Sequence, residues 1–397
     1  MTLDTAVVLA GGEGRRLRPL TKNRPKPMLP AGNRPILEHV LDTLVDADVE
    51  RIVLVVGYKR DRVQEHFGPS YRDVPIEYAI QEKELGSGHA LLQARDAVDE
   101  PMFVLNGDRV IDPGIVTDVA EAFADRGEPT LAVMEHPEAH TFGAVRLDGD
   151  RVTELVEKPL AGEYRLINAG VYAFTPAIFE ALAETPKREG ELDLTAAISR
   201  RIDADRPVWG VRTDGLWVDA TFPWDLLTVT REVLYTDRID EPETDDTLHV
   251  APSAIVHPDA TLRAPLVVGP DSEVGPNAVV GPDTALGRNV TVGANATVER
   301  SVLDADTRVG AGSTLLECVT GEDVDLGANT TVPGGPADVA LDDRVYRDQD
   351  LGAVFADRVS ACGGVTAESG ALVGPNASLG TGVLVRGRVA EDSEVVR

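Results

Sequence analysis

A six-residue repeat runs through the C-terminal part of this 397-residue chain and limits its fold more than any other feature. Eight aliphatic residues stand six positions apart: Val256, Leu262, Val268, Val274, Val280, Leu286, Val292 and Val298. A second row in the same step holds the small or apolar residues Ala260, Leu266, Ser272, Ala278, Thr284, Val290 and Ala296. The repeat slips by one residue, resumes at Leu303, Val309 and Leu315, and returns at Val373, Leu379 and Val385. This period predicts a parallel β-helix with one hexad per side and three per coil.

Glycines follow five of these aliphatic residues, at Gly269, Gly275, Gly281, Gly287 and Gly293. We expect them to allow the turn from one side of the coil to the next, because glycine adopts turn conformations without steric cost.

The first 230 residues have a different pattern, in which short apolar runs alternate with helical spacing. Buried strands are predicted at residues 6–9, 52–56 and 102–105, since continuous apolar runs are typical of parallel sheets. Helices are predicted at residues 36–44, from Pro113 onward and near Trp224. This alternation predicts an α/β fold with a Rossmann-like, mainly parallel sheet that binds ligands at the carboxyl ends of its strands.

The change of pattern also divides the chain. We expect a catalytic domain at residues 1–236, an acidic linker at 237–250 and the β-helix at 251–390.

Composition excludes several classes of partner. A formal net charge of -29 argues against nucleic acid and anionic membranes. No apolar run has transmembrane length and no signal peptide precedes the first strand, and two cysteines, Cys318 and Cys362, make no disulfide framework. We therefore expect a cytoplasmic protein. The acidic surface carries only six lysines, a balance that suits a halophilic cell, where salt screens the self-repulsion.

The segment LAGGEGRRLRPLTKNRPKPMLP, residues 9–30, joins a strand end to glycines and cations. Bare backbone N–H groups after a strand can receive a phosphate, and the cations that follow can hold the charge of a triphosphate. The segment lacks the Gly-Lys-Ser/Thr of a P-loop and the third glycine of a dinucleotide fingerprint. A flexible glycine turn in a basic loop is the alternative, although it does not explain the sequence Pro25-Lys26-Pro27.

Two motifs in this chain resemble those of the sugar-1-phosphate nucleotidylyltransferases. The first is G-x-G-x-R-L followed by P-K-P-M-L-P, present at residues 12–17 and 25–30. The second is QEKELGSGHA at residues 81–90, similar to the base-reading loop of N-acetylglucosamine-1-phosphate uridylyltransferases, with Ser87 where threonine is usual. With the hexad repeat, the resemblance extends to archaeal relatives of the bifunctional uridylyltransferase/acetyltransferase and to glucose-1-phosphate thymidylyltransferases. It implies transfer of a nucleotidyl group to a sugar-1-phosphate, with release of pyrophosphate.

The resemblance also implies a role for each matching residue. Arg16 and Lys26 would be catalytic, and Asp108 and Asp219 would hold Mg²⁺. The nucleotide would contact Leu9, Ala10, Gly11, Gly12, Gly14, Gln81, Gly86 and Ser87, and the sugar phosphate would contact Gly143, Glu157, Lys158 and Asn168, the last at a strand end. Read alone, either aspartate could be a turn or cap residue, Glu157 and Lys158 could be a solvated pair, and His89 is expected to start a helix.

The sequence does not decide between similar substrates. Gln81 and the Gly86 backbone can pair with the uracil edge, but thymine differs by one methyl group, which offers only about 1–3 kcal/mol of discrimination. UTP and dTTP are both candidates, and so are glucose-1-phosphate and N-acetylglucosamine-1-phosphate. A non-catalytic regulatory subunit is a further alternative, marked by degraded loops, but Arg16, Lys26, Asp108 and Asp219 are all present.

The repeat domain resembles the left-handed β-helix family, which implies its handedness and a homotrimer. In bifunctional relatives this domain acetylates glucosamine-1-phosphate from acetyl-CoA with a histidine base. No histidine follows His257 here, so that position is vacant and a trimerising or regulatory role is favoured over acetyl transfer. Cys318 as a nucleophile is a weaker hypothesis, since cysteine in such a coil is usually core.

Overall fold

The computed structural model describes residues 3–160, 163–236, 238–342 and 344–396. The chain forms two compact units. The first holds the residues up to Glu13 together with Leu37–Trp217, and the second holds Gly14–Ile36 together with everything from Val218 onward. The motif loop is thus grouped with the C-terminal part of the chain. The domain limits 1–236, 237–250 and 251–390 stay a prediction.

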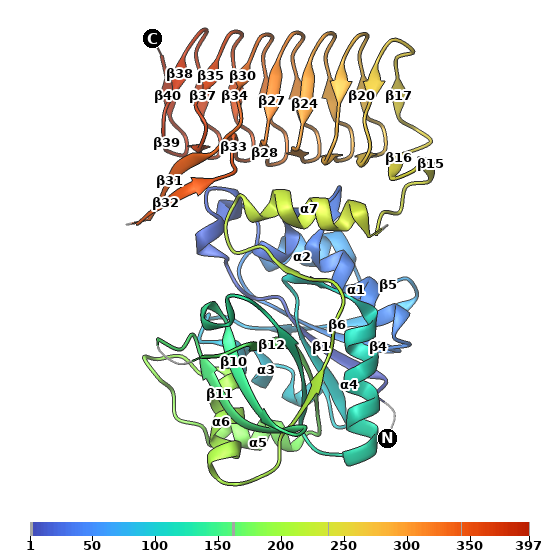
Figure 1. Ribbon diagram of the computed structural model, residues 1–397, viewed down its shortest axis with the longest axis vertical. Coiled ribbons are helices and arrows are strands. Elements are labelled where there is room, and N and C mark those ends of the chain that lie inside the picture. The colour runs from blue at the N-terminus through green and yellow to red at the C-terminus, as the bar shows by residue number, and fades with distance from the viewer. Residues whose placement is uncertain (1–2, 161–162, 237, 343, 397) are drawn as a thin grey trace. The chain divides into compact units, whose positions relative to one another are not determined.

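The first unit is built on a ten-stranded sheet (Figure 1). In sheet order the strands are β10 (Gly143–Asp148), β11 (Arg151–Glu157), β13 (Trp209–Arg212), β9 (Thr130–Glu135), β12 (Leu166–Phe174), β7 (Met102–Asn106), β1 (Thr5–Leu9), β4 (Arg51–Val56), β6 (Val74–Ile80) and β5 (Ser70–Tyr71). The predicted strands at 6–9, 52–56 and 102–105 are confirmed as β1, β4 and β7. Short strand β8 (Arg109–Ile111) follows β7.

The sheet is mixed, not mainly parallel as expected. Strands β6, β4, β1 and β7 are parallel neighbours, but β12 runs antiparallel to both β7 and β9. Strands β10 and β11 are also antiparallel, because their connection is too short to hold a crossover helix. The α/β class itself is confirmed.

Among its described residues, this unit has the α-helices α1 (Ile36–Asp46), α2 (Arg60–Phe67), α3 (Ser87–Leu92), α4 (Pro113–Arg126), α5 (Ala177–Ala183) and α6 (Leu194–Asp203). The predicted helices at 36–44 and from Pro113 are confirmed as α1 and α4. Helix α4 begins where the Asp112 carboxylate accepts the Gly114 N–H at 2.9 Å, and ends at Gly127, whose φ of 65° suits glycine. His89 lies in the first turn of α3, as predicted.

The second unit contains a parallel β-helix with three faces (Figure 1). The first face is β16 (Leu248–Val250), β19 (Leu266–Val268), β22 (Thr284–Leu286), β25 (Val302–Leu303), β28 (Val319–Thr320), β33 (Ala353–Phe355), β36 (Ala371–Val373) and β39 (Arg388–Val389). The second is β17 (Ile255–Val256), β20 (Glu273–Val274), β23 (Thr291–Val292), β26 (Arg308–Val309), β29 (Asp325–Leu326), β34 (Ser360–Ala361), β37 (Ser378–Leu379) and β40 (Glu394–Val395). The third is β18 (Thr261–Leu262), β21 (Val279–Val280), β24 (Thr297–Glu299), β27 (Thr314–Leu316), β30 (Thr331–Val332), β35 (Thr366–Ala367) and β38 (Leu384–Val385).

The hexad residues form the core of this β-helix, as predicted. Val274, Val280 and Leu286 are at most 2 % exposed. The one-residue slip shortens the coil: Leu266 pairs with Thr284, eighteen positions on, whereas Ala285 pairs with Val302, seventeen positions on. The left-handed sense of the coil stays an expectation from the resemblance.

The role expected for the repeat glycines was wrong at most positions. Among the five, only Gly281 has a positive φ, and the left-handed turn residues are mostly Asn or Asp, such as Asn277, Asn289 and Asn295. The glycines are needed because successive coils approach closely: a Cβ on Gly293 would lie 2.7 Å from the Ala311 nitrogen.

Two parts of this unit depart from the regular coil. A hairpin arm of β31 (Ala337–Leu341) and β32 (Arg344–Gln349) extends from one coil, so that Val319 pairs with Val354 thirty-five positions on. Within the segment expected to be a linker, β15 (Glu243–Asp245) and β16 form an antiparallel pair, and β16 starts the first face of the β-helix.

The remaining elements of the second unit come from the motif loop and from residues 218–236. The loop has three short 3₁₀ turns, Arg15–Leu17, Leu20–Lys22 and Lys26–Met28, and a small hairpin of β2 (Pro30–Ala31) and β3 (Arg34–Pro35). Helix α7 (Asp225–Tyr235) confirms the helix expected near Trp224, and its Leu234 packs on Val267 and Ala285 of the β-helix. Of the helices in the described ranges, none is long and apolar enough to cross a membrane.

Candidate active site

Four parallel strands of the first unit end at one edge of its sheet. The segments after β1, β4 and β6 meet there: a Cβ on Gly11 would lie 2.8 Å from Gln81 Oε1, and a Cβ on Gly57 would lie 2.8 Å from the Gly11 carbonyl oxygen. The N–H of Gly107, after β7, donates to the Leu9 carbonyl at 2.9 Å. Glycines are therefore needed here for close approach of backbone segments, and Gly12 itself has open space around it.

Gln81 follows the end of β6 at this edge of the sheet and is only 5 % exposed. Its amide nitrogen donates to the Gly86 carbonyl at 3.2 Å and lies 3.0 Å from Nδ1 of His89. Burial, with a smaller effect of Lys187, lowers the pKa of His89, which favours the neutral ring as an acceptor. Both amide N–H groups are thus occupied, and Oε1 has no hydrogen-bond donor among the described residues.

Gly86 and Ser87 have structural partners in the segment before α6. A Cβ on Gly86 would lie 2.5 Å from the Leu192 carbonyl oxygen, and the φ of Gly86 is 94°. The Ser87 hydroxyl accepts the N–H of Leu194, the first residue of α6, at 3.0 Å. The hydroxyl of Ser87 therefore caps a helix here, and nucleotide contact by this residue stays a prediction.

Asp108 follows the end of β7 and is partly buried. The next residue, Arg109, donates to the Ala169 carbonyl at 3.3 Å, and its guanidinium lies 5.0 Å from the Trp217 ring centre. Trp217 also donates to the Ala169 carbonyl at 2.8 Å. Arg109 was missed from the sequence, where it is one arginine among many.

Three of the four residues expected at the sugar come together. Gly143 pairs with Glu157 across β10 and β11, and a Cβ on Gly143 would lie 3.2 Å from Glu157 Oε2 and 3.6 Å from Cβ of Asn168. The amide of Asn168 donates to the Tyr172 hydroxyl at 2.6 Å. Lys158 has an exposed side chain whose Nζ lies 3.9 Å from Glu157.

Asn168 was expected at a strand end, and this expectation was wrong. It lies inside β12, where the pairing with β9 shifts register between Asn168 and Tyr172. A register shift of this kind changes the direction of a side chain within a strand. It depends on the pairing between β12 and β9, which no sequence motif marks.

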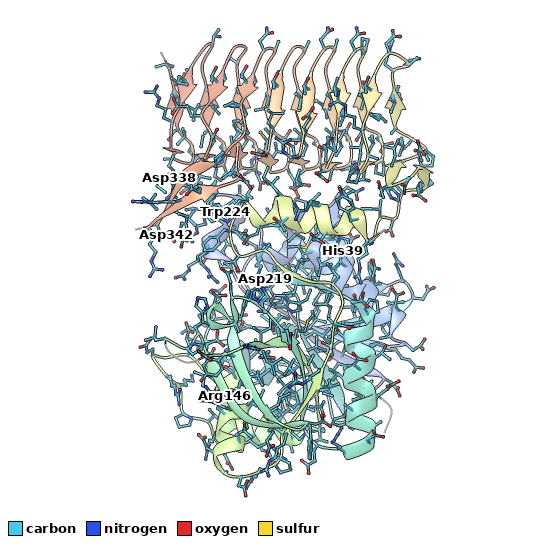
Figure 2. The ribbon with its side chains drawn as sticks, in the orientation of Figure 1. His39, Arg146, Asp219, Trp224, Asp338 and Asp342 are labelled. Atoms are coloured by element: carbon cyan, nitrogen blue, oxygen red, sulfur yellow. The ribbon has the colours of Figure 1, made fainter. Side chains whose placement is uncertain are left out.

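The second unit brings together Gly14, Lys26 and Asp219. Gly14 has a φ of 69°, and a Cβ there would lie 2.7 Å from Cβ of Lys26. The Lys26 ammonium lies 2.6 Å from Asp219 Oδ1, and both side chains are 11 % exposed. The Thr221 hydroxyl donates to the other Asp219 oxygen at 2.9 Å. Asp219 ends strand β14 (Trp217–Asp219) and is labelled in Figure 2.

Arg16, the other cation expected to be catalytic, is exposed. Its guanidinium lies 5.6 Å from the centre of the Phe222 ring. Phe222 in turn stacks on Trp224, labelled in Figure 2, and contacts Tyr346 of the hairpin arm at 4.6 Å between ring centres. An exposed arginine resting on an aromatic ring keeps its charge available to an anion.

Asp225, the first residue of α7, is a group whose role the sequence did not reveal. Its Oδ2 accepts the N–H groups of Thr221 and Phe222 at 2.8 and 2.7 Å. Burial raises the pKa of Asp225 to about 6, and the charge of Asp219 adds to this rise. Asp225 therefore shapes the turn that carries Asp219.

The residues expected to hold Mg²⁺ have suitable chemistry, because Asp108 and Asp219 offer hard carboxylate oxygens and Mg²⁺ needs few protein ligands when phosphates supply the rest. Among the described residues, no group of three or more His, Cys, Asp or Glu could hold a metal by itself. Cys318, by contrast, carries no chemistry: it is fully buried, and burial raises the pKa of its thiol to about 12.

Comparison with known proteins assigns both parts of the chain. Residues 5–235 match the family described as "Nucleotidyl transferase", and residues 262–366 match the "GMPPB C-terminal domain". The first match covers more than half of the chain, which therefore belongs to the nucleotidyl transferase family.

Particular relatives refine this picture. The chain is 39 % identical over 224 residues to "UTP--glucose-1-phosphate uridylyltransferase AglF" of Haloferax volcanii, an alignment covering 55 % of this chain and 92 % of that protein. It is 36 % identical over 274 residues to "Glucose-1-phosphate thymidylyltransferase" of Streptomyces griseus, covering 67 % and 76 %. It is 37 % identical over 237 residues to "Bifunctional protein GlmU" of Methanococcus vannielii, covering 58 % of this chain but only 55 % of that protein.

Among solved structures, a UDP-glucose pyrophosphorylase complexed with UDP-glucose has a TM-score of 0.55 at 23 % identity, and covers 60 % of this chain and all of that one. At this identity the likeness supports the fold alone. Together with the family match, it confirms a Rossmann-like nucleotidyltransferase fold followed by a β-helix.

Proposed function

We propose that this chain transfers the nucleotidyl group of UTP or dTTP to a sugar-1-phosphate, glucose-1-phosphate or N-acetylglucosamine-1-phosphate, and releases pyrophosphate. The observation that carries the proposal is the Gly14–Lys26–Asp219 cluster, in which a nearly buried ammonium is held at a glycine turn beside a carboxylate. The family and the named relatives support the same reaction class.

The reaction needs charge control more than proton transfer. An oxygen of the sugar phosphate forms a bond to the α-phosphorus, the bond from that phosphorus to the bridging oxygen breaks, and pyrophosphate leaves with the electron pair. No protein group has to accept a proton, because the attacking phosphate is already an anion. Lys26 and Arg16 would neutralise the charge that builds up on the triphosphate.

Asp108 and Asp219 would hold Mg²⁺, which supplies further positive charge at the phosphates when bound. Lys26 would then exchange its contact with Asp219 for a phosphate oxygen. Glu157 and Asn168, with Gly143 between them, would contact the sugar, and Lys158 its phosphate.

The base preference follows from Gln81. Its Oε1 is an acceptor with no donor among the described residues, whereas its amide N–H groups are occupied. Uracil and thymine present a donor at N3, but cytosine presents an acceptor there. This supports UTP and dTTP over CTP, and leaves the thymine methyl group undecided.

The test is a panel of UTP, dTTP, CTP, ATP and GTP against four sugar-1-phosphates in high salt with Mg²⁺, read by pyrophosphate release. We expect UTP or dTTP to be used, and Lys26→Ala to lower kcat by at least about a hundredfold. Lys22→Ala is the matched control, since Lys22 lies in the same loop but pairs with Glu391 at 3.1 Å. Full activity in Lys26→Ala, or equal loss in both variants, would contradict the proposal.

The β-helix would serve as an assembly element in a homotrimer. The apolar core that runs through the coils supports a solenoid whose flat faces can associate. Light scattering should then give a mass near three times 42.4 kDa.

A further inference from the structure

The loop Gly14–Ile36 carries both proposed catalytic cations but has little regular structure to hold them. It consists of three-residue 3₁₀ turns and a two-residue hairpin. Short turns of this kind satisfy few of their own backbone groups and fix no side chain. Placing Lys26 therefore requires contacts from outside the loop.

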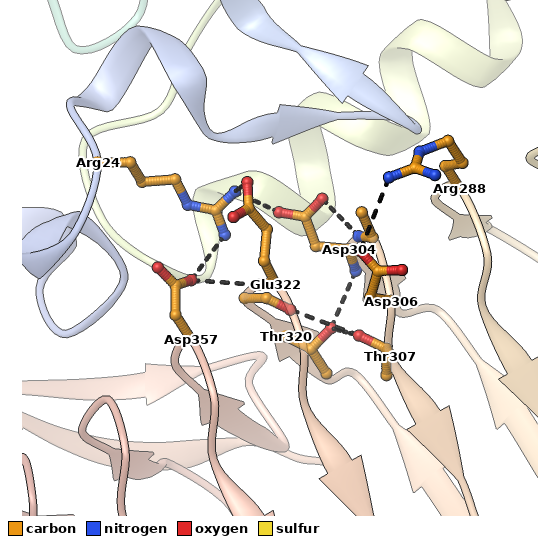
Figure 3. A network of polar contacts seen from close by, with 10 residues as sticks. Arg24, Arg288, Asp304, Asp306, Thr307, Thr320, Glu322 and Asp357 are labelled. Atoms are coloured by element: carbon orange, nitrogen blue, oxygen red, sulfur yellow. Dashed lines mark hydrogen bonds and ion pairs between the residues drawn. The ribbon is translucent and has the colours of Figure 1, made fainter. Parts of the chain in front are cut away.

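Arg24, two residues before Lys26, makes such contacts. Its side chain is 4 % exposed and meets three carboxylates of the β-helix: Asp304 at 2.5 Å, Asp357 at 3.1 Å and Glu322 at 3.4 Å (Figure 3). Arg24 and these three acids are called the Arg24 anchor below. Its depth excludes direct contact of Arg24 with a substrate.

The three acids come from successive coils of one face. Asp304 follows β25, Glu322 follows β28 and Asp357 follows β33, and these strands pair in that order. Three carboxylates stacked in this way repel one another unless a cation lies between them. The guanidinium of Arg24 supplies that cation in a planar geometry that suits several acceptors.

The acids are also held in place by their own hydrogen bonds. The Asp304 N–H donates to the Thr320 hydroxyl at 2.9 Å, which lies 3.0 Å from that of Thr307 (Figure 3). Asp357 Oδ1 also accepts the Glu322 N–H at 3.1 Å. Because the β-helix fixes the positions of these acids, they can in turn fix the position of Arg24 and of the loop that carries it.

Burying these acids is costly, even with the hydrogen bonds that Asp304 and Asp357 accept from β-helix N–H groups. Asp357 is 1 % exposed, and a carboxylate at such depth is stable only when a cation pairs with it. Burial by itself would lower the pKa of Arg24, but the charges of Asp304, Asp357 and Glu322 outweigh it and raise that pKa above its ordinary value. The cluster is thus arranged around the guanidinium.

The chain from Arg24 to Lys26 is stiff. Pro25 and Pro27 fix φ at their own positions and restrict the residues before them, which are Arg24 and Lys26 themselves. A shift of Arg24 therefore displaces Lys26, whose Cβ is already confined by Gly14.

We propose that the Arg24 anchor positions Lys26 for nucleotidyl transfer, so that carboxylates of the β-helix control the catalytic loop. Arg24 is a positioning residue and acts only through Lys26. The proposal rests on the function proposed above, but the anchoring itself can be measured without activity.

The test uses the full chain with the nearly isosteric Asp357→Asn and with Arg24→Lys. Displacement of a positioned group by about 1 Å can cost on the order of a hundredfold, so we expect kcat to fall by about tenfold to a hundredfold in both variants. Glu391→Gln is the matched control, because Glu391 is an exposed β-helix carboxylate that pairs with the same loop at Lys22. It should keep full activity.

A double-mutant cycle separates positioning from general damage. If Arg24 acts through Lys26, then Asp357→Asn added to Lys26→Ala lowers kcat no further. Multiplied losses in the double variant, or full activity of Asp357→Asn alone, would overturn the positioning role.

Hydrogen exchange of residues 14–30 gives the readout that does not need activity. Asp357→Asn should speed exchange in this segment, whereas Glu391→Gln should leave it unchanged, and unchanged exchange in both would overturn the anchor. If the wild-type chain turned over no substrate pair, the proposed function would fail, and the exchange data would still decide whether the anchor holds the loop.

Discussion

The proposed metal site can be tested at Asp219. Asp219 holds the Lys26 ammonium at 2.6 Å and would also be a ligand of Mg²⁺. Asp219→Asn removes a charged oxygen ligand, so we expect the Mg²⁺ concentration for half-maximal rate to rise at least about tenfold, and EDTA to abolish activity of the wild type. Rates are measured as a function of Mg²⁺ at saturating substrate.

Asp246→Asn, a change on the exposed turn between β15 and β16, serves as control for loss of one carboxylate. An unaltered Mg²⁺ titration in Asp219→Asn would remove Asp219 from the metal site.

Asp225 predicts how stability depends on pH. Its pKa is about 6 when folded against 3.8 in an unfolded chain, so between about pH 4 and pH 6 the folded state holds a proton that the unfolded state has lost. The free energy of unfolding therefore falls as pH rises through this window, by on the order of 3 kcal/mol for this group. Asp225→Asn keeps an acceptor oxygen for the two N–H groups and removes the titration.

We expect Asp225→Asn to be more stable than the wild type at pH 7 and to lose the advantage near pH 4. Urea unfolding at the two pH values measures this. Equal pH slopes in both proteins would show that Asp225 does not titrate in this window.

Among the elements, the β-helix coils give a direct test of the glycine argument. A Cβ on Gly293 would lie 2.7 Å from a backbone nitrogen of the next coil, whereas the only close atom at Gly363 is 3.2 Å away. Gly293→Ala should cost about 1–3 kcal/mol of unfolding free energy and Gly363→Ala clearly less, because a contact of 3.2 Å needs a smaller shift of the backbone than one of 2.7 Å. Chemical denaturation of both variants measures the difference, and equal effects would contradict it.

The elements also show what the sequence could reveal. The aliphatic hexads identify the β-helix because every coil places an aliphatic residue at the same position. Strands β1, β4 and β7 are identified by continuous apolar runs, which are also a local pattern. The hairpin arm β31–β32 interrupts the repeat with alternating residues that match no motif, and β12 contains a register shift that no local pattern marks. The register shift arises from pairing with the distant strand β9, whereas the strands of the arm pair only with each other.

The candidate site follows the same rule. Motifs predicted the individual residues, and neighbouring strand ends bring Gly11, Gln81 and Gly86 together. Arg24 was missed because its partners lie about 280 to 330 positions away, so nothing near it in the chain distinguishes it from other loop arginines. Long-range ion pairs of this kind become visible only in three dimensions.

The whole molecule carries a net charge of -29, which predicts a strong response to salt. Salt at 1 M shortens the Debye length to about 3 Å and so removes most of the repulsion between carboxylates. Tm should therefore rise between 0.1 M and 2 M KCl, as measured by scanning calorimetry. A neutral osmolyte at equal osmolality is the control, and a constant or falling Tm in KCl would argue against adaptation to high salt.

Transfer of a nucleotidyl group by this chain can be followed directly with labelled nucleotide. Two reactions are run with the preferred sugar-1-phosphate and Mg²⁺. One contains UTP or dTTP with radioactive phosphorus at the α position, and the other contains the same nucleotide labelled at the γ position. We expect α label in a nucleotide sugar and γ label in pyrophosphate, in equal amounts, and formation of both at least about a hundredfold slower with Lys26→Ala. Label from the γ position in the sugar product or in orthophosphate would contradict nucleotidyl transfer.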